Sequence, residues 1–171
     1  LGVIPESRGL VCAGEDYVET VEGWVQSLTE AGRVYRMKSN GAVYWAAAER
    51  LSTLAPVYPE AIFLPQPPVH LLLPPNPIGN NAREDHIYSV ISGWVESSGP
   101  LTATELSCSL RIPIDDVTYA LAQLEQKGNV LRGSFRAEIG EEEFCDRRVL
   151  SRIHSSTIAK LRREIEPVAT T

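Results

Sequence analysis

The chain has 171 residues, of which 43% are hydrophobic and 22% charged, as in an ordinary folded domain or two small ones. The formal net charge is −6 at pH 7, which disfavours nucleic-acid binding spread evenly over the surface, because such binding is largely electrostatic. No apolar run approaches the roughly 18–20 residues of a membrane span, so we expect a cytoplasmic protein with no membrane contact.

The cysteines and histidines are scattered along the chain. Cys12, Cys108 and Cys145 lack the close spacing of a metal site or a disulfide framework, so we expect buried free thiols and no metal or cofactor in this segment. The only methionine is Met37 and the chain begins at Leu1, which indicates a fragment of a longer protein. Residues 1–15 show no periodicity, and we expect either a loop there or the end of an element whose remainder lies outside this sequence.

Residues 1–54 are predicted to form a partial winged-helix-like module. A helix is expected over 16–31, because its apolar side chains recur at helical spacing, and Gly32 ends it. A hairpin follows over 33–46 around Asn40-Gly41, a pair that tolerates positive φ in a tight turn. The predicted apolar face of the helix comprises Tyr17, Val21, Trp24, Val25 and Leu28.

Residues 55–84 hold 8 of the 12 prolines of the chain. Proline at this density neither continues a helix nor fills a central strand, so we expect an extended linker. The apolar run 71–73 indicates that this linker packs on a module.

Residues 85–147 are predicted to form a complete winged helix of three helices and a hairpin. The helices are expected over 85–96, from the capping box Thr102–Glu105 to Leu110, and over 113–127. Gly128 ends the third helix, and the wing strands are expected over 130–137 and 143–147. The predicted core faces comprise Ile87, Val90, Ile91, Trp94 and Val95 on the first helix, and Val117, Ala120, Leu121 and Leu124 on the third.

The two halves repeat with a constant offset of 96 residues. Val25, Leu28, Gly32, Val34 and Arg36 correspond to Leu121, Leu124, Gly128, Val130 and Arg132. These positions cover the helix, its stop and the first wing strand. We therefore expect an α+β fold, mainly helical, with two winged-helix-like modules in tandem, each with a β-hairpin wing.

Residues 148–168 are predicted to form a basic amphipathic helix, which runs from about Arg148 to Ile165 and is ended by Pro167. At about 100° per residue, four arginines fall within an arc of roughly 100° and the apolar side chains cover the opposite side. From Arg147 to Arg163 there are six basic residues and no acidic one. The four arginines are Arg148, Arg152, Arg162 and Arg163.

Enzymatic motifs are missing. No glycine-rich loop ends in Lys-Ser/Thr and no helicase-type acidic box occurs, so we expect no ATP hydrolysis by this segment. The run 141–143 of three glutamates is interpreted as a solvated wing tip. His154 beside Ser155 and Ser156 is interpreted as local helix polarity rather than a nucleophile–base pair.

Two surfaces are candidates for nucleic-acid binding. One is the arginine stripe of the last helix, with Arg132 and Arg136 of the wing; the alternative is a solvated face or one paired with acidic groups elsewhere. The other is the outward face of 113–127 with Tyr119 and Gln123, which in a winged helix is the recognition face. Asp115 and Asp116 at the start of that helix would repel phosphate, so a structural or protein-contact role is the alternative there.

The end of the chain also carries a family resemblance. Residues 144–168 read FCDRRVLSRIHSSTIAKLRREIEPV, and residues 44–51 read YWAAAERL, followed by VYPEA. These segments resemble the carboxy-terminal extension of Lhr, the large helicase-related proteins of superfamily 2. The resemblance covers roughly 24–168, and the extension is similar in architecture to tandem winged-helix DNA glycosylases. The catalytic Gln-x-Gln pattern of those enzymes does not occur here, because two residues separate Gln123 from Gln126.

The resemblance implies a non-catalytic module that holds or orients DNA, single-stranded or duplex, beside an ATP-dependent helicase motor involved in DNA repair. ATP and Mg²⁺ would bind to the motor of the parent protein, and other domains of the parent would be partners. Two alternatives stay open. One is a self-association scaffold that forms a homo-oligomer, and the other is part of a glycosylase-like domain.

Overall fold

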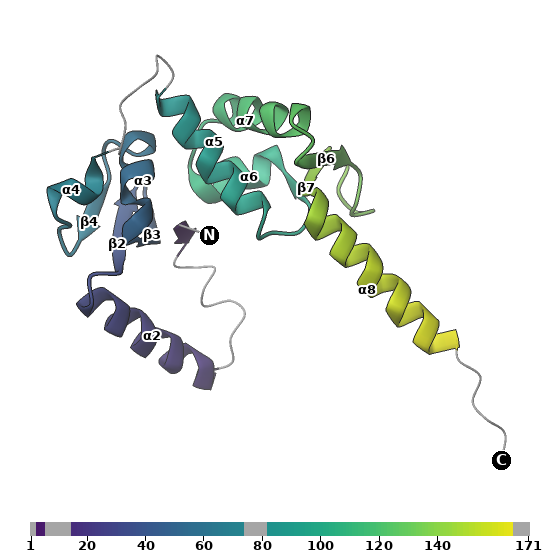
Figure 1. The fold of residues 1–171 in the computed structure, drawn as a ribbon, viewed down its shortest axis with the longest axis horizontal. Helices are drawn as coiled ribbons and strands as arrows, with labels where there is room; N and C mark the ends of the chain where they lie inside the picture. Colours follow the sequence, from purple (N-terminus) through teal and green to yellow (C-terminus); the bar gives the residue numbers. More distant parts are fainter. Residues whose placement is uncertain (1–2, 6–14, 74–81, 166–171) are drawn as a thin grey trace.

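A computed structural model describes residues 3–5, 15–73 and 82–165, and it has an α+β fold built from helices and two small antiparallel sheets (Figure 1). The predicted linker prolines at 74–77 and the expected helix end at Pro167 lie outside the described residues. The elements of the first part are β1 (Val3–Pro5), α2 (Glu15–Glu30), β2 (Val34–Ser39), β3 (Ala42–Ala47), a 3₁₀ turn η1 (Ala48–Arg50), α3 (Leu51–Val57), β4 (Ile62–Leu64) and α4 (Val69–Leu72). Those of the second part are α5 (Ala82–Val95), β5 (Leu101–Thr102), α6 (Ala103–Leu110), α7 (Ile114–Gln126), β6 (Val130–Gly133), β7 (Glu143–Asp146) and α8 (Arg147–Ile165).

The first sheet has the strand order β1-β3-β2-β4, and every neighbouring pair is antiparallel. The predicted hairpin is confirmed: β2 and β3 pair from Val34 opposite Ala47 to Ser39 opposite Ala42. Asn40 and Gly41 form its turn with φ of 49° and 74°, as the Asn-Gly pair predicts.

The second sheet has the order β5-β7-β6. Thr102 caps α6 in the predicted capping box, since its side chain accepts from the Glu105 N–H and Glu105 accepts from the Thr102 N–H. The predicted core faces of α5 and α7 are buried, and these two helices pack against each other. The third strand of this sheet, β5, was not predicted from the sequence.

The repeat of 96 residues is present in the backbone hydrogen bonds. The N–H groups of Gly32 and Arg33 donate to the carbonyls of Thr29 and Leu28, and those of Gly128 and Asn129 donate to the carbonyls of Glu125 and Leu124. Gly32 and Gly128 have φ of 65° and 72°. Both helices therefore end in the same Schellman motif and pass into a strand through a left-handed glycine.

One hydrophobic core joins the two parts of the chain. Tyr44, Leu51 and Leu54 belong to the same cluster of buried residues as Trp94 and Leu121, and α3 packs against α5. Two tyrosines of the first part donate hydrogen bonds to carbonyls at the end of α6: Tyr44 to Ser109 at 3.3 Å and Tyr58 to Leu110 at 2.7 Å. The two parts are therefore packed together rather than merely tethered.

Several boundaries differ from the sequence analysis. Val3–Pro5 forms an edge strand on β3 rather than a loop. Strand β6 ends at Gly133 instead of residue 137, because the N–H groups of Phe135 and Arg136 donate to the Glu143 carboxylate instead of pairing with a strand. The proline-rich stretch includes β4, which pairs with β2, and α4, whose Leu71 and Leu72 pack against the core.

The helix predicted over 16–31 is present as α2, but its apolar face is not buried where the structure describes its side chains; Tyr17 and Val21 of that face lie outside the described side chains. Trp24 is 59% exposed, and Val25 and Leu28 are only half-buried. The helix packs chiefly against β2, beside the sheet and apart from α5 and α7 (Figure 1). A helical apolar stripe shows that a face favours burial, but it does not show that a partner lies within the same chain.

Candidate nucleic-acid interface

Helix α8 begins at a capping aspartate. The Oδ1 atom of Asp146 accepts hydrogen bonds from the N–H groups of Arg148 at 2.8 Å and Val149 at 3.1 Å. Asp146 itself is buried at the end of β7, and the Arg147 N–H donates to the Asn129 carbonyl at 3.0 Å. These bonds fix the direction in which α8 leaves the second sheet.

Beyond its first turn, α8 projects away from the rest of the chain (Figure 1). Val149 is buried against the body, whereas Ile153 is 42% exposed and Leu161 51% exposed. Nearly all residues from 151 to 164 are exposed. Both the apolar side and the arginine side of this helix are therefore open to solvent.

The arginine stripe, defined as Arg148, Arg152, Arg162 and Arg163, lies on the exposed part of α8. Within the described residues, none of these four side chains forms an ion pair. To partners in the described part of the chain, the stripe makes one side-chain hydrogen bond, from Arg163 Nε to the Ala159 carbonyl of the same helix at 3.5 Å. The stripe thus presents guanidinium groups that no carboxylate of the described residues neutralises.

The two wing arginines proposed from the sequence are engaged within the chain. Arg132 pairs with Glu142. Arg136 donates from Nη1 and Nη2 to the two oxygens of Glu105, at 3.0 and 2.7 Å, and from Nε to Glu143. Because these carboxylates occupy both guanidinium groups, we leave Arg132 and Arg136 out of the proposed interface.

The interpretation of 141–143 as a solvated wing tip is wrong for Glu143, because its side chain is fully buried. It accepts hydrogen bonds from the N–H groups of Phe135 at 2.7 Å and Arg136 at 2.6 Å, and from the Arg136 side chain. Burial acts to raise the pKa of the Glu143 carboxyl, but these hydrogen bonds outweigh it, and the net pKa lies below the ordinary value. The side-chain hydrogen bond from Arg136 likewise lowers the pKa of Glu105. Glu143, Arg136 and Glu105, which we call the Glu143 clasp, hold the loop 134–142 against α6.

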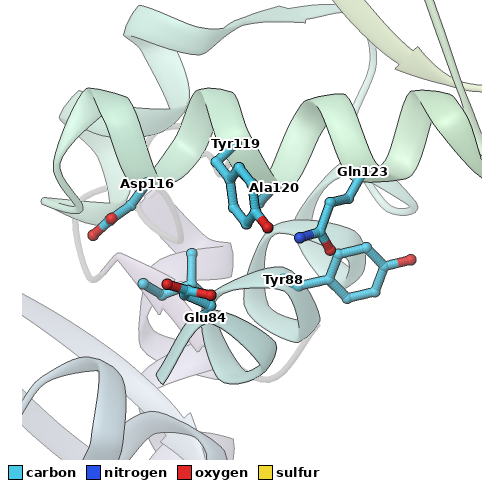
Figure 2. Close-up of a pocket in the computed structure, with 7 residues that line it drawn as sticks. Glu84, Tyr88, Asp116, Tyr119, Ala120 and Gln123 are labelled. Atoms are coloured by element: carbon cyan, nitrogen blue, oxygen red, sulfur yellow. The ribbon is translucent and has the colours of Figure 1, made fainter. Parts of the chain in front are cut away.

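Tyr119 and Gln123 lie in a shallow groove between α5 and α7, where their side chains point toward α5 (Figure 2). The same groove is lined by Glu84, Tyr88 and Asp116. Asp116 pairs with Arg83 at 2.8 Å, and the Lys127 ammonium lies 4.1 Å from the centre of the Tyr88 ring. Tyr119 remains 53% exposed, but its carboxylate neighbours repel phosphate, so this groove is a weaker candidate than the stripe.

The structure also describes two of the three cysteines and allows a search for metal sites and membrane-spanning helices. Cys145 is buried, and burial raises the pKa of its thiol, whereas Cys108 is exposed, contrary to expectation; Cys12 lies outside the described residues. No group of three or more His, Cys, Asp or Glu side chains with metal-binding geometry occurs among the residues that the structure describes. In that same part of the chain, no helix is both long enough and apolar enough to cross a membrane.

Comparison with known proteins gives one informative match. No family model matches the chain. The chain is 24% identical, over 157 residues or 89% of its length, to a protein of Mycolicibacterium smegmatis described as Lhr helicase/probable uracil glycosylase. The match covers 10% of that protein, so the chain spans about a tenth of the length of this relative. The resemblance to the large helicase-related proteins is thereby confirmed, as similarity to one region of a helicase.

Proposed function

We propose that this chain is a non-catalytic DNA-binding module of an Lhr-type, ATP-dependent DNA helicase that acts in DNA repair in the cytoplasm. The similarity to a region of an Lhr helicase supports this proposal. In such a parent, ATP and Mg²⁺ bind to the motor, because this segment has no loop that would cradle a triphosphate. Other domains of the parent are then direct partners.

We also propose that α5, α6, α7 and the β6–β7 hairpin form a winged helix. Three helices followed by an antiparallel hairpin have the order and lengths of that motif. The matching helix ends at Gly32 and Gly128 support a second, partial unit formed by α2, β2 and β3. In this arrangement α8 follows the wing directly.

The observation that carries the proposal is the unneutralised arginine stripe on α8. Guanidinium groups offer paired donors in a fixed plane, which suits phosphate oxygens. The chain as a whole is acidic, at −6, so contact with DNA must be local, and the stripe gathers four exposed arginines on one side of a single helix. Four phosphate contacts give a slope of log K against log salt of about −3 to −4.

A salt titration with matched variants tests the proposal. Replacing Arg148, Arg152, Arg162 and Arg163 by Ala should abolish measurable binding to short DNA and flatten the salt dependence. The control replaces four exposed basic residues elsewhere, Arg33, Lys38, Arg50 and Lys127, and changes the net charge equally. Equal losses in both variants would show that only net charge matters and would contradict a local site.

The second candidate function is self-association through the apolar side of α8. The exposed Ile153 and Leu161 on α8 favour it, because such side chains gain by burial against a partner. If α8 joins copies of the chain, I153D/L161D should lower the mass measured by light scattering to that of a monomer. An unchanged mass would leave DNA binding as the role of α8.

The relative's description also names a probable uracil glycosylase. A glycosylase role is tested on the intact parent protein by uracil release from DNA. We expect uracil release to survive the stripe variant if the catalyst lies outside this chain.

A further inference from the structure

The arginines of α8 are not evenly spaced but form two pairs. Arg148 and Arg152 lie one turn apart near the base of the helix, and Arg162 and Arg163 lie near its far end. Arg162 lies ten positions after Arg152, which corresponds to about 15 Å along a helix axis. Both pairs fall within the same arc of roughly 100°, so they face the same side.

The surface between the pairs carries no charge. Ser155 and Ala159 occupy this face between Arg152 and Arg162, and both are small and exposed. A single strand that followed the helix would place phosphates opposite this neutral stretch without a cationic partner. Two phosphate backbones separated by a groove would instead meet one pair each.

The composition of α8 also favours duplex over single-stranded DNA. Single-strand binding gains much of its free energy from bases stacked on aromatic side chains. The sequence of α8, RRVLSRIHSSTIAKLRREI, contains no Phe, Tyr or Trp. The exposed tyrosine of the neighbouring region, Tyr119, lies in the groove with Glu84 and Asp116, whose charges oppose a nearby phosphate.

Resting on the proposed function, we infer that α8 lies across the major groove of duplex DNA, with Arg148 and Arg152 on one phosphate backbone and Arg162 and Arg163 on the other. The spacing of about 15 Å fits the roughly 12 Å width of the major groove better than the roughly 6 Å of the minor groove. The contact is to backbones, so it selects duplex form rather than base sequence.

The first test compares a duplex with its single strand, using the full chain. The duplex should bind at least tenfold more tightly, with a slope of log K against log salt of about −3 to −4. R148A/R152A and R162A/R163A should each make the slope of log K against log salt on duplex less steep, from about −4 to about −2. The reason is that each double variant removes two phosphate contacts. Equal affinity for single strand and duplex would overturn the inference while leaving the proposed function intact, and binding to neither would overturn both.

The second test changes the geometry at constant charge. Two alanines inserted between Ala159 and Lys160 rotate the far pair by about 200° relative to the near pair. The slope of log K against log salt on duplex should then become less steep, at about −2, which is the value for one arginine pair. The matched control inserts two alanines between Arg163 and Glu164, which leaves both arginine pairs on the same side of the helix. This control should bind duplex like the unaltered chain. If the rotated variant also binds duplex like the unaltered chain, the two arginine pairs do not contact two phosphate backbones.

Discussion

At the scale of single residues, the Glu143 clasp explains how the irregular loop 134–142 is held. Glu143 is fully buried, yet it stays ionised because Arg136 and two backbone N–H groups donate to it. The same Arg136 reaches Glu105, which in turn caps α6. One arginine thereby connects the loop, β7 and the start of α6.

This clasp makes the stability of the fold depend on pH in a defined direction. The folded pKa of Glu143 lies below its ordinary value of 4.5, so its contribution is present above about pH 4.5 and is lost as the pH falls through the lower folded pKa. E143Q should therefore lower the urea midpoint of unfolding at pH 7. The difference in urea midpoint between E143Q and the unaltered chain should become smaller in acid. Urea titrations at pH 7 and at successively lower pH values measure this.

E142Q is the control for that prediction. Glu142 also pairs with an arginine, but its side chain is 65% exposed, and surface pairs contribute little. Its urea midpoint should match that of the parent at both ends of the pH range. A Glu143 variant as stable as this control at pH 7 would show that the clasp is dispensable.

At the scale of elements, the helix ends at Gly32 and Gly128 are equivalent. Both glycines have positive φ, and an added Cβ would meet nothing closer than 3.7 Å at Gly32 and nothing within 4 Å at Gly128. Substitution by alanine therefore costs backbone strain alone, about 1–2 kcal/mol. G32A and G128A should each lower the free energy of unfolding by that amount.

The control for these two variants is G140A. Gly140 lies in the loop between β6 and β7, with open space around it and without a positive φ. Alanine there should leave stability unchanged or raise it by up to about 1 kcal/mol. Unequal costs at Gly32 and Gly128, with one near zero, would indicate that the two helix ends are not equivalent in solution.

Elements with strong local signals could be predicted from the sequence. The capping box at Thr102, the Asn40-Gly41 turn and the glycine stops each depend on contacts within a few residues. The short strands β1, β4 and β5 could not be predicted, because pairing with distant strands decides them. Such edge strands have two or three residues and no periodicity of their own.

The candidate site shows the same limit. The arginine stripe is visible in the sequence because helical spacing brings its residues onto one face. That α8 projects from the fold is not visible, because a helix packed on the core has the same apolar and basic pattern. Similarly, Arg136 and Glu105 are 31 residues apart, and only the fold reveals that they pair.

At the scale of the whole molecule, one core spans both parts, so we expect a single unfolding transition. Tyr58 lies at this junction, is buried, and donates to the Leu110 carbonyl at 2.7 Å. Y58F removes this bond and should cost about 1–2 kcal/mol, which corresponds to a fall in Tm of about 2–8 °C. Y119F, at an exposed position, should stay within about 0.5 kcal/mol of the parent. Two separate transitions in the parent chain would contradict the shared core.

The central claim is that α8, rather than α7, contacts DNA, and hydrogen exchange with and without a short duplex tests it most directly. Beyond its first turn α8 projects from the body, so its amides should exchange readily in the free chain. With duplex bound, exchange should slow over 150–163 and stay unchanged over 114–126. Slower exchange over 114–126, with α8 unaffected, would contradict the account and assign DNA binding to α7.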